Sequence, residues 1–159
     1  NRHFKQQLDK YTDSGIQILW QCGQKEYDEL EDSIDNPGVQ LIPFSNEMGS
    51  LYSAADLIVS RAGALALSEM SLLGKAMVLI PFPHSAGDHQ TMNAKAFSTS
   101  GAAELIPQSH LEEGDLETAV LNLFDQPEKI RAMEKKSLEM AASDATEKIV
   151  AVIMEIAEN

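Results

Sequence analysis

The chain has 159 residues, of which 43% are hydrophobic, and its 25 acidic side chains against 12 basic ones give a formal net charge of −13. This length and composition fit one domain, residues 1–159, with a core of its own. The charge argues against nucleic acid and against an anionic membrane surface as partners, because binding to either needs a basic face. The single cysteine, Cys22, cannot form an internal disulfide, so we expect a reducing, cytoplasmic compartment.

Short aliphatic segments alternate with amphipathic segments as far as Ile106. The expected strands are Ile16–Cys22, Val39–Phe44, Leu57–Ser60, Ala76–Pro81 and Ala103–Ile106. The expected helices are Phe4–Tyr11, Tyr27–Asp32, Met48–Ala54, Ala64–Leu73 and Thr91–Thr99. This alternation predicts βαβ units and one parallel sheet. Because the strands are almost continuously apolar, helices should cover both faces of the sheet.

The pattern changes after Ile106, where three consecutive helices are expected, at Leu111–Phe124, Pro127–Ala142 and Ala145–Ala157. The predicted fold is therefore α/β, a Rossmann-like half with a C-terminal helical tail. Its first element is a helix, whereas a doubly wound domain opens with a strand and a glycine-rich turn. We expect that strand and loop to lie just upstream of Asn1.

The first informative segment is Ala55–Glu69, which reads as a strand, a turn of small residues and a helix. A ligand can approach the backbone at Gly63, and the unpaired N–H groups of the helix start suit a diphosphate. Arg61 could add a charged contact to that ligand or could serve the fold. Gly74 is expected to end the helix. Turns of this kind are common, so the segment alone is equally consistent with a plain strand-to-helix turn.

Glu69 favours the ligand-binding interpretation. It lies about one and a half turns into the helix, beside apolar residues. At that depth a carboxylate can accept both ribose hydroxyls of a nucleotide whose phosphates bind the helix start. A plain surface glutamate is the alternative.

The second informative segment, Pro81–Ala94, follows the next strand, where open α/β sheets bind ligands. Asp88 is a suitable N-cap for a helix that begins at His89, and Gln90 and Asn93 share its first turn. Two histidines could suggest a metal, but the spacing His84-x₄-His89 matches no standard zinc pattern, so we expect none. His84 is as well suited to holding the loop as to contacting a ligand.

At these residues the sequence resembles the MurG family, bacterial enzymes that add N-acetylglucosamine to the lipid-linked precursor of peptidoglycan. The resemblance extends over essentially the whole chain. The matching segments are Trp20–Gly23, Phe44–Met48, Ser60–Leu65, Ser68–Glu69, Pro81–His84, Asp88–Gln90, Asn93–Ala94, Gly101–Ala103 and Asp144–Thr146.

The resemblance implies the C-terminal half of a GT-B glycosyltransferase, in which two Rossmann-like domains face each other across a cleft. It implies that this half binds UDP-N-acetylglucosamine, with the backbone of Ser45 at the uracil, Glu69 at the ribose, and His89 and Gln90 at the sugar. The first turn of the helix would line the diphosphate. The full set of substrate-binding residues expected is Ser45, Arg61, Gly63, Ala64, Leu65, Ala66, Ser68, Glu69, His84, His89, Gln90 and Asn93.

The implied reaction is an inverting transfer without a cofactor, in which the acceptor hydroxyl attacks C1 of the sugar as UDP leaves. The lipid-linked acceptor would bind mainly to the other half, and the parent enzyme would be peripheral on the cytoplasmic face of the bacterial inner membrane. No catalytic base is assigned, because the family's candidate histidine lies in that other half. Two features depart from the family: Ala66 replaces a common threonine, and the glycine-rich loop is missing. The isolated chain is expected to be inactive.

Three alternatives remain at this stage. The chain could be a free-standing catalytic subunit, like the small subunit of the eukaryotic dolichol-linked N-acetylglucosamine transferase. It could be a GT-B protein of the UDP-N-acetylglucosamine 2-epimerase kind. It could also be a non-catalytic α/β module that recognises partners.

Overall fold

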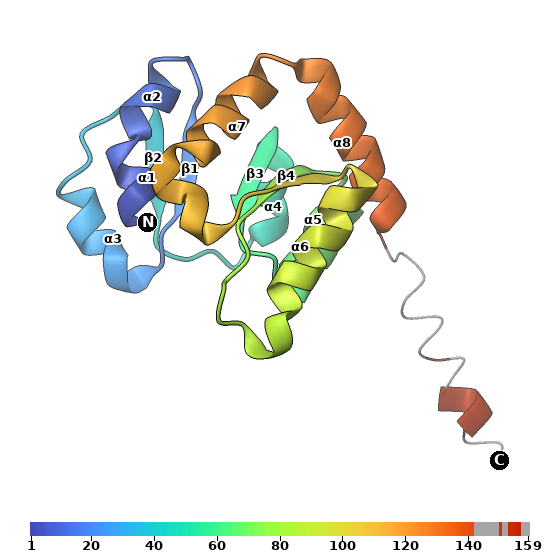
Figure 1. Cartoon of the computed structure of the whole chain (residues 1–159). Helices are drawn as coiled ribbons and strands as arrows, with labels where there is room; N and C mark the ends of the chain where they lie inside the picture. Colours follow the sequence, from blue (N-terminus) through green and yellow to red (C-terminus); the bar gives the residue numbers. More distant parts are fainter. Residues whose placement is uncertain (142–149, 151–152, 157–159) are drawn as a thin grey trace.

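The structure is a computed structural model that describes residues 1–141, 150 and 153–156 (Figure 1). Its strands are β1 (Ile18–Gln21), β2 (Val39–Ile42), β3 (Leu57–Ser60), β4 (Ala76–Leu79) and β5 (Ala103–Leu105). Its α-helices are α1 (Arg2–Gln6), α2 (Leu8–Thr12), α3 (Gln24–Glu31), α4 (Met48–Ala54), α5 (Ala64–Leu72), α6 (His89–Ser100), α7 (Asp115–Phe124) and α8 (Pro127–Met140). Two 3₁₀ helices, η1 (Ala86–Asp88) and η2 (Gln108–Glu113), lie in the connections.

All strand pairs in the described residues are parallel, as predicted, but they form two sheets instead of one. β1 pairs with β2, in a register that places Ile18 opposite Val39. β3, β4 and β5 form the second sheet in that order, with Ser60 opposite Leu79. The prediction of a single sheet was wrong because β1 and β3 do not pair with each other.

The three-stranded sheet lies between two layers of helices, as its strand sequences predicted. β4 is buried along its whole length, and its side chains alternate between the two faces. Ala76 and Val78 pack with α7 and α8, in a cluster that includes Leu123 and Met133. Met77 and Leu79 pack on the opposite face with residues of α5 and α6, namely Leu67, Met70 and Ala94. The expectation of helices on both faces is confirmed.

Two predicted helices are each divided. The segment Phe4–Tyr11 forms α1 and α2, which are separated at Gln7, where the backbone has φ −111° and ψ 2°. The segment Leu111–Phe124 is divided at Gly114, whose φ of 84° lies in the left-handed region that glycine readily adopts. Gly74 follows the end of α5 with φ +63°, as a C-terminal glycine should.

The C-terminal tail lies only partly within the described residues. The predicted helix Pro127–Ala142 is observed as α8, and Ala142 itself is outside them. Of the predicted helix Ala145–Ala157, residues 150 and 153–156 are described and helical. Across the portions of the chain that the structure covers, no helix has the length and apolar character needed to span a bilayer.

Candidate functional site

Both informative segments lie at one edge of the three-stranded sheet. β3 ends at Ser60 and leads through a short turn to α5, while β4 ends at Leu79 and leads through a longer loop to α6. Ser60 and Leu79 are paired in the parallel register, so the two connections leave the sheet side by side. In Figure 1 the β4–α6 connection is the green loop at the lower edge of the molecule. This is the edge at which open α/β sheets bind ligands.

Gly63 is the N-cap of α5, and the fold itself gives no reason for a glycine there. Its φ of −69° and ψ of 138° are extended values that any residue adopts. A Cβ atom added to Gly63 would have no neighbouring atom within 4 Å among the described residues. The space in front of this turn is therefore open.

The first turn of α5 presents unpaired amides to that space. The N–H of Leu67 is the first to bond back along the chain, to Gly63 O at 3.0 Å. No side chain caps the helix, and its first turn carries no acidic residue. The amides of Ala64, Leu65 and Ala66 therefore stand at the positive end of the helix dipole. The Ser68 hydroxyl donates to Ala64 O at 3.0 Å, within the helix.

Glu69, farther along α5, is half-buried. No described residue donates a hydrogen bond to its carboxylate or forms an ion pair with it. Burial, with a smaller contribution from the Glu69 charge, raises the pKa of the nearby Tyr52 hydroxyl. A half-buried carboxylate that accepts no hydrogen bond from the protein is free to accept one from a ligand.

Arg61 joins the two connections. Its Nη1 donates to Ile80 O at 3.0 Å and to Pro81 O at 3.3 Å, and its Cζ lies 5.7 Å from the centre of the Phe82 ring. Burial lowers the pKa of this guanidinium group. Of the two roles that the sequence allowed, these contacts favour the structural one: Arg61 fixes the start of the β4–α6 loop.

Two polar residues of α6 are also bonded within the protein. Asn93 Nδ2 donates to Ala62 O at 3.1 Å, which ties α6 to the β3–α5 turn. Gln90 Oε1 accepts the Phe82 N–H at 3.0 Å, and the Gln90 N–H donates to Ser85 Oγ at 3.3 Å. One polar atom of each side chain has no hydrogen-bond partner among the described residues. These atoms are Gln90 Nε2 and Asn93 Oδ1.

The two histidines are exposed and do not lie in a common cluster of metal-ligating side chains. The His84 ring meets the Phe82 ring edge to face, with ring centres 5.9 Å apart. His89 begins α6, and its ring covers Gly87 so closely that an added Cβ there would lie 3.1 Å from Nε2. Asp88 occupies the N-cap position with a left-handed φ of 55°, but its side chain makes no cap hydrogen bond. The expectation that this carboxylate caps α6 was wrong, because the backbone geometry differs from the extended one that capping needs.

Ser45 lies in the connection between β2 and α4. Its hydroxyl accepts the Glu47 N–H at 2.9 Å, while its own backbone N–H and C=O form no hydrogen bond with the backbone of the described residues. Three residues that contribute to this region were not among the predicted site residues: Tyr52 beside Glu69, and Phe82 and Ser85 as partners of Gln90. Tyr52 carries no sequence signal, because it lies 17 positions from Glu69 on a different helix.

The comparisons with known proteins agree with one another. Residues 1–149 match the glycosyltransferase family 28 C-terminal domain. The chain is 38% identical over 162 residues to a Porphyromonas gingivalis protein named UDP-N-acetylglucosamine--N-acetylmuramyl-(pentapeptide) pyrophosphoryl-undecaprenol N-acetylglucosamine transferase, covering 100% of this chain and 42% of that protein. Proteins of the same name from Chlorobium limicola and Nostoc punctiforme are 37% and 34% identical, over 89% and 99% of this chain and 39% and 44% of their own length. The chain thus spans less than half of these relatives.

The structure is similar to the crystal structure of Acinetobacter baumannii MurG, with a TM-score of 0.80 and 30% sequence identity. That match covers 97% of this chain and 46% of the other. A glycotransferase of kitacinnamycin, at 20% identity and a TM-score of 0.57, shares the fold. All of these matches are consistent with the fold of the C-terminal half of a GT-B enzyme. The chain therefore belongs to the family of glycosyltransferase family 28 C-terminal domains.

Proposed function

We propose that this chain is the donor-binding half of an inverting transferase that moves N-acetylglucosamine from UDP-N-acetylglucosamine to a lipid-linked muramyl-peptide in cell-wall synthesis. One observation carries the proposal: an open turn at Gly63 leads to three unpaired amides and, farther along the same helix, to a carboxylate without a partner. The names of relatives that match over the whole chain support the choice of donor and acceptor.

The diphosphate would lie against the start of α5. The amides of Ala64, Leu65 and Ala66 can donate to phosphate oxygens, and the helix dipole favours negative charge there. The absence of a Cβ at Gly63 lets the ligand approach the backbone. A chain with a net charge of −13 needs such a local device to hold an anion.

The nucleoside would extend from the diphosphate along two further groups. The Glu69 carboxylate would accept hydrogen bonds from both ribose hydroxyls, because it is half-buried and accepts none from the protein. The free backbone N–H and C=O of Ser45 would pair with the uracil edge.

The transferred sugar would lie beside the β4–α6 connection. The exposed His89 and His84 and the unpaired Nε2 of Gln90 can contact its hydroxyls. This connection is also held in place by hydrogen bonds from Gln90, Asn93 and Arg61. Part of their contribution to sugar binding therefore comes from positioning the connection.

In the proposed reaction the acceptor hydroxyl attacks C1 of the sugar with inversion, and the bond from C1 to the UDP oxygen breaks. The negative charge that develops on UDP is stabilised by the amides of α5 as preorganised donors. The acceptor and the group that removes its proton belong to the other half of the enzyme. With a lipid-linked acceptor, we place the parent enzyme on the cytoplasmic face of the inner membrane.

Calorimetric titration of the intact enzyme with UDP tests the assignment. The change Glu69→Ala removes a charged acceptor and should weaken UDP binding by about 1.5–3 kcal/mol, roughly 10- to 150-fold. The matched control is Glu134→Ala, which removes a half-buried glutamate of α8 that lies outside the candidate site and also has no partner among the described residues. Unchanged UDP affinity in Glu69→Ala would overturn the assignment, and product analysis with UDP-N-acetylglucosamine would separate transfer from hydrolysis or epimerisation.

A further inference from the structure

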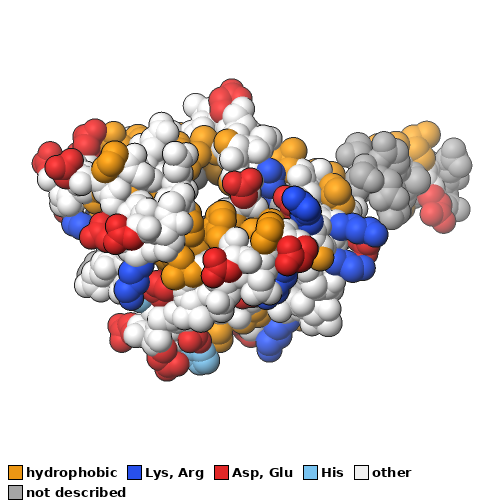
Figure 2. Space-filling view, turned by 90° about the horizontal axis from the view of Figure 1, so that it is seen from above, with side chains coloured by type: hydrophobic (Ala, Val, Ile, Leu, Met, Phe, Trp, Pro, Cys, Tyr) orange, Lys and Arg blue, Asp and Glu red, His pale blue; other side chains and the backbone are white. Residues whose placement is uncertain are grey.

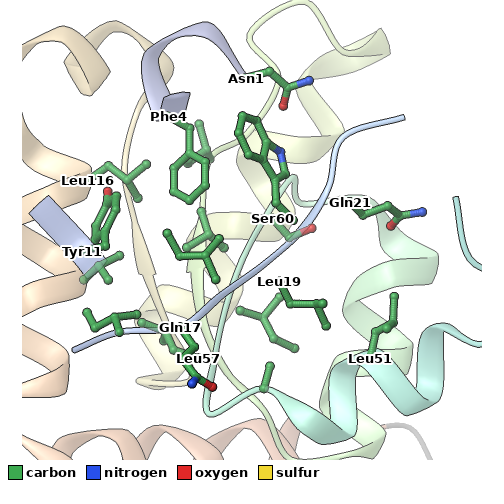
Figure 3. Close-up of a pocket in the computed structure, with 18 of the residues that line it drawn as sticks. Asn1, Phe4, Tyr11, Gln17, Leu19, Gln21, Leu51, Leu57, Ser60 and Leu116 are labelled. Atoms are coloured by element: carbon green, nitrogen blue, oxygen red, sulfur yellow. The ribbon is translucent and has the colours of Figure 1, made fainter. Parts of the chain in front are cut away.

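Arg61 lies between two apolar features of the described residues. One is a cavity of about 480 Å³ between the two sheets (Figure 3), and in Figure 2 hydrophobic side chains gather around a hollow in the middle of the surface. Of the expected substrate-binding residues, only Arg61 lines this cavity. The other feature is the side chain of Phe82, which stays 42% exposed in the β4–α6 connection. Phe82 therefore belongs to the candidate site, and the cavity does not.

Three residues that were predicted to contact the ligand converge on Phe82. The Arg61 guanidinium lies over the Phe82 ring, with Cζ 5.7 Å from the ring centre. The His84 ring meets it edge to face, at an interplanar angle of 85° and with ring centres 5.9 Å apart. Gln90 Oε1 accepts the Phe82 N–H at 3.0 Å. One residue that was not predicted thus joins three that were.

The backbone at Phe82 is fixed on both sides. Its N–H bonds to the Gln90 side chain, and its C=O accepts the Ser85 N–H at 3.2 Å. Pro81 and Pro83 flank it in the sequence, and each proline ring restricts the backbone at its own position. The Phe82 ring is therefore held in place before a ligand arrives, so binding against it costs little conformational entropy.

The connection itself does not require an aromatic side chain at this position. The hydrogen bonds of Phe82 use its backbone N–H and C=O, which every residue except proline provides. The two hydrogen bonds of Arg61 go to the carbonyls of Ile80 and Pro81. Phe82 is also absent from the hydrophobic core clusters of the described residues. The exposed surface of the ring is therefore available to a ligand.

The donor in the proposed function carries a sugar with two kinds of substituent. Its hydroxyls are polar, and the site offers polar atoms to them in Gln90 Nε2 and Asn93 Oδ1. The acetamido group differs, because it joins a flat amide to an apolar methyl. Ligand sites commonly combine a few polar groups with an aromatic wall. The β4–α6 connection leaves the sheet beside the turn proposed for the diphosphate, so the ring and this sugar would be neighbours.

We propose that Phe82 selects the acetamido group of the transferred sugar, an assignment that rests on the proposed function. The methyl and the amide plane of that group lie against the exposed surface of the ring, and the methyl leaves water as it binds. A sugar with a hydroxyl in place of the acetamido group leaves the ring surface uncovered. Arg61 and His84 act on this contact through Phe82, as positioning residues that hold the ring.

Calorimetric titration of the intact protein with UDP, UDP-glucose and UDP-N-acetylglucosamine tests the proposal. UDP-glucose has a hydroxyl where UDP-N-acetylglucosamine has the acetamido group. In Phe82→Ala the affinity for UDP-N-acetylglucosamine should fall about tenfold or more, toward that for UDP-glucose. The affinities for UDP and UDP-glucose should not change. Phe82→Tyr keeps the ring and should keep the preference. The matched control is Phe124→Ala, an exposed phenylalanine at the end of α7, outside the candidate site.

The three ligands separate the ways in which the proposal could fail. Equal losses for both sugar nucleotides, or no loss, would overturn it, because the ring would then not distinguish the acetamido group. A loss that includes UDP would assign the ring to the loop and overturn it as well. If Phe82→Ala does not fold, Phe82→Leu decides: it removes the flat ring, and an unchanged preference would contradict the proposal. Absence of UDP binding by the unmodified protein would refute the proposed function, and this assignment with it.

Discussion

Replacing Arg61 by methionine should lower the stability of the fold, and a loss of ligand affinity should follow from the displaced β4–α6 connection. The guanidinium donates to two carbonyls of the β4–α6 connection, at 3.0 and 3.3 Å. A hydrogen bond from a charged donor contributes about 1.5–3 kcal/mol when buried, but Arg61 is only partly buried, so water can replace it at the carbonyls. We therefore expect a total loss of about 1–2 kcal/mol. For a chain of this size that corresponds to roughly 2–8 °C in the unfolding temperature.

Thermal unfolding followed by circular dichroism, together with calorimetric titration by UDP, separates the two roles of this arginine. A positioning role predicts a lower unfolding temperature in Arg61→Met, a weaker affinity for UDP-N-acetylglucosamine, and little recovery in Arg61→Lys, since a lysine cannot reproduce the fork of donors. The control is Arg131→Met, an exposed arginine without a partner among the described residues. An unchanged unfolding temperature with lost UDP affinity, restored by lysine, would refute the reasoning and make Arg61 a phosphate ligand.

Four further predictions concern other positions. Tyr11 is buried and its hydroxyl has no hydrogen-bond partner among the described residues, so Tyr11→Phe should leave the free energy of unfolding unchanged or raise it by up to about 1 kcal/mol. Burial, and to a smaller extent the Glu117 charge, raises the pKa of Tyr11 above its value in the unfolded chain. The free energy of unfolding should therefore fall as the pH rises above the ordinary tyrosine value of 10.0. In urea titrations across that range, Tyr11→Phe should lose less stability than the native protein. Gly74→Ala should cost more than Gly101→Ala in the same assay: both have a left-handed φ, but an added Cβ lies 2.7 Å from Leu138 Cγ at Gly74 and 3.7 Å from Lys136 Cγ at Gly101. Gln90→Ala should weaken UDP-N-acetylglucosamine more than UDP in calorimetry, and equal losses would assign Gln90 to the nucleotide or to the fold.

Local patterns in the sequence predicted most of the fold. The aliphatic segments around β1 to β5 identify every strand in the described residues, because buried parallel strands are almost continuously apolar. The break at Gly114 has a local cause, and the glycine marks it. The break at Gln7 has no such mark, since glutamine is a good helix former. The prediction of a single sheet failed because the pairing of strands depends on which of their edges meet in the folded chain, and no local pattern in the sequence specifies that β1 and β3 do not pair.

The sequence predicted those parts of the candidate site whose residues lie close together along the chain. The turn at Gly63 and the carboxylate at Glu69 follow from one strand, one turn and one helix. The hydrogen bonds made by the side chains of Arg61, Gln90 and Asn93 join residues 8 to 31 positions apart, and no pattern in the sequence reveals which carbonyl or amide each side chain meets. Their polar character suggested ligand contacts, whereas in the folded chain each of these side chains also forms hydrogen bonds within the protein.

The substitution Gly63→Ser tests the central claim most directly, with UDP affinity measured by calorimetry on the intact protein. Serine is a better N-cap than glycine, and an added Cβ meets no protein atom within 4 Å, so the helix should be as stable as before or more so. The same side chain fills the space at the turn and bonds to an amide that the proposed diphosphate needs. We predict at least a tenfold loss of UDP affinity with an unfolding temperature that is unchanged or higher. Full UDP affinity in this variant would contradict the placement of the diphosphate at the start of α5.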